Sequence, residues 1–401
     1  MNKKKHLAFP FILAFISGCN SQTSPSQELD DAVLPPPSKY CKVTNVDSLV
    51  CDGGYSWWTE PLLDITDGKI ALTGVGVEEG KSIQWITLFD TKKRTLYTYE
   101  YPRYYASDEH NTPSVIHHDG YWWSAVTGHS ELGSSKGNIV TLYKFDQSLT
   151  IVDQVEFTLP NAASYSQLMV VDGLLVIGTR DRDRGWGLLS TKTGEWYRFG
   201  THGLNYQLMN AQSPNVGSTS SYHPKHTYQA IGSRVLELDQ EGRLNRLVEK
   251  NEVVSTSEAA RLLSRVRDDK GTGCALYSEL NADNSWSLFI ASIGSDYIQN
   301  TQFLGTFWGM LGEKTNPDFN GKYILGGALV DCQTAIVASK QEEQYTLSLE
   351  SLTEDSKVLY ESERELYRPL VENGYVMFNE ASFWNSYSDY SARQYILPLL
   401  K

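Results

Sequence analysis

The chain has 401 residues, a formal net charge of −13, 10 tryptophans and 24 tyrosines. The acidic balance argues against a nucleic-acid partner, because no basic surface large enough to release many counterions is visible. An anionic ligand would therefore need a local basic site. The aromatic content fits a β protein, in which cross-strand packing would account for most of the rings and carbohydrate binding for some of them.

The first residues have the layout of an export signal peptide. Three lysines at positions 3–5 are followed by an apolar stretch at 7–16 and by small residues in front of Cys19. The run from Ile16 to Cys19 resembles the lipobox of bacterial lipoproteins, in which the cysteine is acylated and becomes the mature N-terminus. The alternative, a spanning anchor, needs roughly 20 apolar residues. This run is shorter, and Pro10 interrupts it.

We therefore expect a signal peptide at 1–19, a tether at 20–39 and a folded part at 40–401, either as one large β domain or as two smaller ones. The tether is rich in Ser, Gln and Pro, which is typical of a disordered or extended segment. By resemblance to Gram-negative sorting rules, Asn20 after the cysteine implies an outer-membrane lipoprotein on the cell surface or the periplasmic face. More than one acyl chain would hold it stably.

Four cysteines remain once Cys19 is set aside, an even number for an oxidising compartment. Cys41 with Cys51 would close a short loop at the start of the folded part, and Cys274 with Cys332 would join adjacent elements. The alternative is four buried thiols. None of the four has the close spacing of a zinc site.

Short strand-like runs recur along the folded part around an Asp-Gly or Asn-Gly turn, the strongest local signal for a β-hairpin. These turns stand at 67–68, 119–120, 172–173, 320–321 and 373–374. Where they follow one another directly they lie about 40 to 60 residues apart, the spacing of four-stranded propeller blades. We expect an all-β fold, a seven-bladed β-propeller, with one helical insertion at 257–266. A two-sheet sandwich is the alternative.

Three further runs, 86–90, 140–145 and 187–190, each lead into a turn. They resemble the third strand of a sialidase-type (BNR) blade, near the position of its Asp box. The Asp box itself is degraded here.

Histidines are concentrated in one part of the chain, which indicates a site. Apart from His6, they are His110, His117, His118, His129, His202, His223 and His226. We expect His110 and His129 near one rim of the central channel, where either could transfer a proton near neutral pH or serve only a structural role. We expect His117 and His118 to be exposed loop residues.

The stretch 108–129 resembles the signature of BNR-type propellers that include ulvan lyases of the PL25 and PL24 type, which act on sulfated algal polysaccharide. Those families commonly read Asp-Asp-His-Asn-x-Pro, a hairpin and Gly-His, and Glu109 replaces the second acid here. The resemblance continues at 163–165, 178–180 and 221–224. It implies the catalytic set His110, His129, Tyr165, Arg180 and Tyr222. The expected substrate-binding set is Asn111, Arg184, His223 and Lys225.

These residue types suit β-elimination from a uronic acid. Abstraction of the C5 proton is difficult while the adjacent carboxylate is ionised, so a cation must neutralise it. Arg180 suits this task because its planar fork binds a carboxylate bidentately. Tyr165 and His110 would transfer the protons at C5 and at the departing C4 oxygen. Which one is the base is left open.

Two basic clusters have competing interpretations. In the alternating run 180–184, Arg182 or Arg184 could hold a sulfate, or the run could be a solvated hairpin with surface ion pairs. His223 and His226 could contact an anionic sugar or ligate a structural metal, although a third ligand is not identified. No cofactor is expected to be required.

Three functions remain in view. The first is a polysaccharide lyase that cleaves a sulfated, uronate-containing polysaccharide such as ulvan and leaves 4,5-unsaturated uronate ends. The second is a non-catalytic glycan-binding propeller lipoprotein, and the third is a sialidase-like glycoside hydrolase, which the degraded Asp boxes and clustered histidines disfavour. The expected partners are the anionic polysaccharide and, through the lipid, the membrane. We expect no nucleic acid and a monomeric protein.

Overall fold

Nearly all of the regular structure is β-strand. The structure, a computed structural model, describes residues 35–399 apart from 46–47, 55–58, 60, 104, 130–135, 172, 182–184, 199–216, 221–230, 240–243, 251–259, 268–272, 284, 294–297, 309–325 and 387–388. These residues belong to the unit Leu34–Lys401. Among them there is no α-helix, and no helix long and apolar enough to cross a membrane was found.

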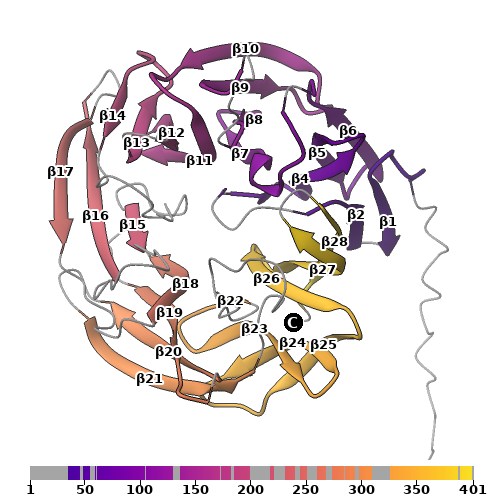
Figure 1. Ribbon diagram of the computed structural model, residues 1–401, viewed down its shortest axis with the longest axis vertical. Coiled ribbons are helices and arrows are strands. Elements are labelled where there is room, and N and C mark those ends of the chain that lie inside the picture. The colour runs from indigo at the N-terminus through magenta and orange to yellow at the C-terminus, as the bar shows by residue number, and fades with distance from the viewer. Residues whose placement is uncertain are drawn as a thin grey trace, which may run out of the picture. The chain divides into compact units, whose positions relative to one another are not determined.

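The described strands form seven antiparallel sheets (Figure 1). The first sheet holds β3 (Leu63–Thr66), β4 (Lys69–Glu78), β5 (Lys81–Asp90) and β6 (Thr95–Glu100). The second holds β7 (Ser114–His118), β8 (Tyr121–Val126), β9 (Ile139–Phe145) and β10 (Ile151–Thr158). The third holds β11 (Ala163–Val171), β12 (Leu174–Asp181), β13 (Gly185–Ser190) and β14 (Trp196–Arg198).

The remaining sheets follow in chain order. The fourth holds β15 (Gly217–Ser220), β16 (Ile231–Leu238) and β17 (Leu244–Lys250). The fifth holds β18 (Ala260–Arg267), β19 (Gly273–Leu280), β20 (Trp286–Ile293) and β21 (Ile298–Phe307). The sixth holds β22 (Gly326–Leu329), β23 (Thr334–Gln341), β24 (Gln344–Ser351) and β25 (Lys357–Ser362). The last holds β26 (Glu365–Glu372), β27 (Tyr375–Ser386), β28 (Asp389–Pro398), β2 (Ser48–Asp52) and β1 (Cys41–Asn45).

Contacts between the sheets close a ring. Each sheet touches the next in chain order, mostly through its first strand, and the last sheet touches the first. The contacting pairs are β3 with β7, β7 with β11, β11 with β16, β16 with β18, β18 with β22, β22 with β26 and β26 with β3. A closed ring of antiparallel sheets is the architecture of a β-propeller. The predicted all-β propeller fold is therefore confirmed.

The predicted hairpin turns have the backbone that a two-residue turn requires. In the Asp67-Gly68 turn the φ angles are 56° and 77°, and in the Asn373-Gly374 turn they are 44° and 81°. Both central residues of a type I′ turn need positive φ, which Gly, Asn and Asp adopt most readily. The Asp119-Gly120 turn is alike, with 52° and 76°. The turn predicted at 320–321 lies outside the described residues.

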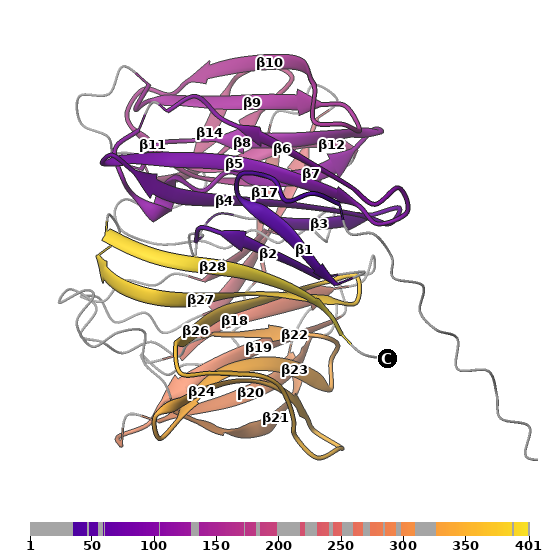
Figure 2. The same cartoon turned by 90° about the vertical axis from the view of Figure 1, so that its right-hand side faces the viewer.

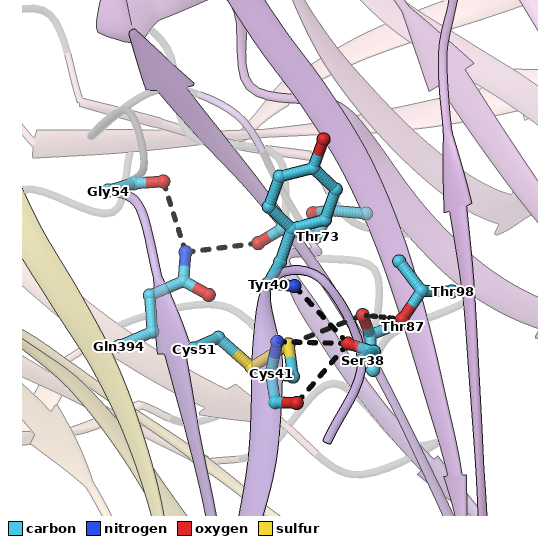
Figure 3. The surroundings of a disulfide bond; sticks show 9 residues. All are labelled: Ser38, Tyr40, Cys41, Cys51, Gly54, Thr73, Thr87, Thr98 and Gln394. Carbon is cyan, nitrogen blue, oxygen red and sulfur yellow. Dashed lines mark hydrogen bonds between the residues drawn. A yellow bond between two sulfur atoms is a disulfide. The ribbon is translucent and has the colours of Figure 1, made fainter. Parts of the chain in front are cut away.

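The N-terminal strands complete the last sheet. β2 pairs with β28, with Leu49 opposite Ile396, and β1 pairs with β2. Figure 2 shows β1 and β2 beside β28 from the side. In Figure 3 the Gln394 side chain of β28 donates to the carbonyls of Gly54 at 3.0 Å and Thr73 at 3.1 Å. Two chain ends distant in sequence thus close the ring.

Both predicted disulfides are present. Cys41 and Cys51 are bonded directly across β1 and β2 (Figure 3). Cys274 in β19 is bonded to Cys332 in the turn between β22 and β23, which ties the fifth sheet to the sixth. The alternative of four buried thiols is therefore wrong.

Two local predictions are also wrong. The helix predicted at 257–266 is replaced, in its described part, by β18. Pairing with β19 and packing of Leu263 and Val266 against the apolar cluster of the fifth and sixth sheets outweigh weak helix propensity. His117 and His118 are not exposed loop residues. They end β7 and are half-buried, and the His117 amide donates to Asp64 at 2.7 Å. The predicted third-strand runs lie in β5, β9 and β13, each the third strand of its sheet.

Candidate active site

A single turn in front of β7 gathers the polar side chains of the site. The 3-10 helix η1 (Glu109–Asn111) begins after Asp108, whose side chain accepts a hydrogen bond from the His110 amide at 2.9 Å. Asp is a favoured cap because it satisfies an amide that the helix leaves unpaired. η1 contacts β4, β5 and β11, so the turn lies where the first three sheets meet.

Asn111 joins this turn to the segment that carries His129. Its side-chain oxygen accepts from the His129 amide at 2.6 Å, and its side-chain nitrogen donates to Ser82 Oγ at 2.9 Å and to the Ala106 carbonyl at 3.0 Å. The residue is fully buried. These bonds fix His129 relative to His110. Contact of Asn111 with a substrate stays a prediction.

Asp108 binds both histidines. One carboxylate oxygen lies 2.5 Å from His110 Nδ1, and the other lies 3.1 Å from His129 Nδ1. The two imidazole rings are stacked, with centroids 4.3 Å apart. The His129 and Asp108 side chains are 20% and 22% exposed, against 8% for His110, so solvent reaches the cluster on their side.

The pKa values of the two histidines are shifted in opposite directions. Burial favours the neutral form of both, but in His110 the charge and hydrogen bond of Asp108 outweigh it and raise the pKa. Burial and the neighbouring charge of His110 lower the pKa of His129 to about 4. Burial would raise the pKa of Asp108, but the histidines hold it well below its usual range. His110 is thus shifted toward its protonated form and His129 toward its neutral form.

Tyr165 contacts the neutral histidine. Its hydroxyl lies 3.3 Å from His129 Nε2, and its buried ring stacks on Trp186 with centroids 5.8 Å apart. A β-bulge between Ser164 and Ser166 gives Tyr165 a φ of 57° and points it away from the regular pleat. Since His129 Nδ1 faces Asp108, its Nε2 can accept the tyrosine proton.

Arg180 reaches the same cluster from β12. It pairs with Ser164, the residue before Tyr165, and is 6% exposed. Its positive charge acts on both His110 and His129, lowering the pKa of each. Four of the five predicted catalytic residues, His110, His129, Tyr165 and Arg180, are thus brought together. The fifth, Tyr222, lies outside the described residues, as do Arg184, His223, Lys225 and His226.

Two acidic residues of this turn were not among the predicted site residues. Asp108 organises the histidines, and Glu109 lies with one carboxylate oxygen 3.8 Å from His110 Nε2. Glu109 is 1% exposed, and neither oxygen has a hydrogen-bond partner among the described residues. Burial raises its pKa to about 8. Only their place in the motif signalled them in the sequence.

Asp108, His110 and His129 also have ligand atoms close enough together to hold a metal ion. In the structure, however, each Asp108 oxygen faces a histidine Nδ1 at hydrogen-bond distance, so a metal there would have to replace both bonds. With both Nδ1 atoms on Asp108, each histidine keeps its Nε2 atom for another contact.

Comparisons with known proteins bear on the fold. No family model and no curated protein matches the chain. A solved ulvan lyase of family PL25 is 11% identical with a TM-score of 0.50, over 87% of this chain and 94% of that chain, and its complex with -[GlcA(1-4)Rha3S]- gives the same values. Polysaccharide lyase Uly1 is 9% identical with a TM-score of 0.49, over 90% and 99%. The β-propeller domain of the Trilobed protease from Pyrococcus furiosus is 9% identical with a TM-score of 0.47, over 85% and 97%. At this identity the likeness to the ulvan lyase shows a shared fold.

Proposed function

We propose that this protein is a polysaccharide lyase that cleaves a uronate-containing polymer by β-elimination. The observation that carries the proposal is the pair of stacked histidines on one aspartate, with a tyrosine hydroxyl beside the histidine whose pKa is lowered. Titratable groups whose pKa values are pushed apart are typical of paired acid and base roles. We also propose that the seven sheets are the blades of a seven-bladed, BNR-type propeller.

In this mechanism Tyr165 and His129 act together as the base. His129 Nε2 accepts the tyrosine proton while the phenolate oxygen takes the proton from C5, and the C5–H electrons form the C4–C5 double bond. Tyr165 is buried without substrate, and catalytic contacts of this kind often form fully only in the complex. The C4–O bond breaks, and the departing oxygen takes a proton from His110.

Arg180 would neutralise the uronate carboxylate. A carboxylate next to C5 opposes carbanion formation, and a buried guanidinium can bind both of its oxygens. Arg180 is as buried as His110. A charge placed there acts more strongly than one in water.

For the substrate we propose a sulfated polysaccharide such as ulvan. Support comes from the ulvan lyase of the same fold, which was solved with a repeat of GlcA and Rha3S. The test follows the unsaturated uronate by ultraviolet absorbance when purified full-length protein is mixed with ulvan. A rise that Tyr165→Phe and Arg180→Ala abolish is expected. Binding of ulvan without any rise would instead identify a glycan-binding module.

We further propose that Cys19 is acylated and that the protein is an outer-membrane lipoprotein. The support is the signal-peptide layout of residues 1–19. Metabolic labelling with a palmitate analogue should mark the wild-type chain and not Cys19→Ser. Equal labelling of both would rule out acylation at this position.

A further inference from the structure

Two residues inside strands have a left-handed backbone. Nine described non-glycine residues have positive φ, and within strands these are only Tyr165, at 57°, and Arg368, at 47°. The others are in turns: Asp67, Glu79, Arg94, Asp119, Leu149, Glu342 and Asn373. A left-handed residue with a side chain is strained, and such strain is concentrated at functional sites.

The two residues are placed by the same device. Tyr165 lies in the bulge of β11, and Arg368 lies where the register of β26 shifts between Tyr367 and Leu370. β11 and β26 are each the first strand of their sheet, on the side where the sheets contact one another. Gly326 accommodates the second bulge, because a Cβ there would lie 2.8 Å from Arg368 Cα. A bulge changes the direction of a side chain. Here both side chains belong to strands through which the sheets contact one another.

Arg368 acts on the turn that carries the histidines. It is 5% exposed, and its charge acts on Glu109, whose carboxylate lies 3.8 Å from His110 Nε2. Arg180 acts on His110 and His129 from the third sheet. The charges of two guanidinium groups from different sheets therefore act on the same turn.

We propose that Arg368 binds a second anionic group of the polysaccharide, distinct from the carboxylate that Arg180 holds. This inference rests on the proposed function for the identity of the polymer. A planar guanidinium pairs bidentately with the oxygens of a sulfate ester or of a carboxylate. The group is then a sulfate on the neighbouring sugar or the carboxylate of a neighbouring uronate.

The test measures binding directly, so that it does not depend on cleavage. Full-length Tyr165→Phe protein, with and without Arg368→Gln, is titrated with ulvan and with the same polymer after chemical desulfation. Arg364→Gln is the matched control, since it removes one positive charge from the same part of the chain at a side chain that is 50% exposed. We expect Arg368→Gln to weaken binding to ulvan roughly tenfold to a hundredfold and Arg364→Gln to leave it unchanged.

The outcomes distinguish the two possible anionic groups and can overturn the proposal. A loss only with the sulfated polymer assigns the group as a sulfate, and an equal loss with both polymers assigns it as a carboxylate. Binding of Arg368→Gln equal to that of Arg364→Gln on both polymers overturns the proposal. If Arg368→Gln does not fold, Arg368→Lys replaces it, for which a several-fold loss is expected and unchanged binding overturns the proposal. Failure of the wild type to cleave any polymer refutes the lyase assignment alone.

Discussion

The imidazole rings of His110 and His129 lie stacked with centroids 4.3 Å apart, and their pKa values move in opposite directions. Two cationic rings at this distance would repel, so the protonation of one opposes that of the other. Asp108 stabilises the charge mainly on His110 through the shorter hydrogen bond. The two rings of the stacked pair therefore titrate in different pH ranges.

This pairing predicts the pH dependence of the proposed lyase activity. His129 must be neutral to act as base, so kcat/KM should rise as pH increases through about 4, the pKa of that histidine. His110 must be protonated to act as acid, so the rate should fall only above the ordinary histidine pKa, since its own pKa is raised. Initial rates across the pH range measure both limbs. An acidic limb near the ordinary histidine value would contradict the role of His129.

Replacing Asp108 should impair the proposed roles of both His110 and His129. In Asp108→Asn the charge that raises the pKa of His110 is lost, so the alkaline limb should move to lower pH. The rate should fall by roughly two to four orders of magnitude, the usual contribution of positioned proton-transfer groups. Asp64→Asn is the control, because Asp64 accepts from the His117 amide outside the site and its loss should leave the rate unchanged. Equal rates for the two variants would exclude Asp108 from the mechanism.

Removing the hydroxyl of Tyr165 should remove activity and leave the fold. Tyr165→Phe keeps the stacking on Trp186 but loses the contact with His129, and the expected loss is roughly a hundredfold or more. Tyr101→Phe is the matched control, because its buried hydroxyl donates to Ser124 away from the histidines. It should lower thermal stability and keep the rate. A fully active Tyr165→Phe would require another base.

The buried Glu109 should make the folded protein less stable as pH rises. Its pKa is raised from 4.5 in the unfolded chain to about 8, so the folded protein holds a proton that the unfolded chain has released. Between these two pKa values, the free energy of unfolding of Glu109→Gln should therefore increase relative to that of the wild type, by up to about 1.4 kcal/mol for each pH unit. Denaturant unfolding at pH 5 and pH 7 measures the difference.

The control for this variant is Glu380→Gln. Glu380 is also buried, but its carboxylate accepts hydrogen bonds from Ser362, Tyr360 and Tyr395. Its replacement should therefore destabilise the protein. A pH-independent effect of Glu109→Gln would show that Glu109 is ionised in the folded protein.

The two disulfides should differ in their contribution to the free energy of unfolding. The bond between Cys41 and Cys51 spans 10 residues, and the bond between Cys274 and Cys332 spans 58. If the bonds act by restricting the unfolded chain, replacing each pair with serine should cost about 3 and about 4 kcal/mol respectively. Unfolding of the two double variants measures the order. A larger loss for the first pair would show that its bond acts mainly in the folded ring.

The sequence predicted the elements of the fold that depend on local chemistry. Asp67-Gly68 and Asn373-Gly374 predicted turns correctly because few other residue pairs adopt two positive φ angles in succession. β18 was predicted as a helix because its local sequence is compatible with one. Pairing with β19, which the local sequence does not reveal, makes it a strand. Pairing of β2 with β28 leaves no local signal, since it depends on the whole ring.

In the site, too, residues with a local sequence signal were predicted and residues that depend on the folded structure were not. The histidine motif and the family resemblance predicted His110 and His129, and the structure places them in contact. Asp108 and Glu109 were visible as letters of the motif, but their importance comes from burial and from the distances to the rings. Arg368 had no sequence signal at all, because a bulge is a property of strand pairing.

The junction of β2 with β28 also has a consequence for folding. A chain that grows or emerges from its N-terminus presents β1 and β2 first and β28 last. The ring therefore cannot close through this junction until β28 is available, and the closure joins distant parts of the sequence. Contacts of such long range slow folding, because the loop entropy is lost before the contacts form. The bond between Cys41 and Cys51 is local and can form beforehand, so the hairpin that completes the ring can be ready before its partner arrives.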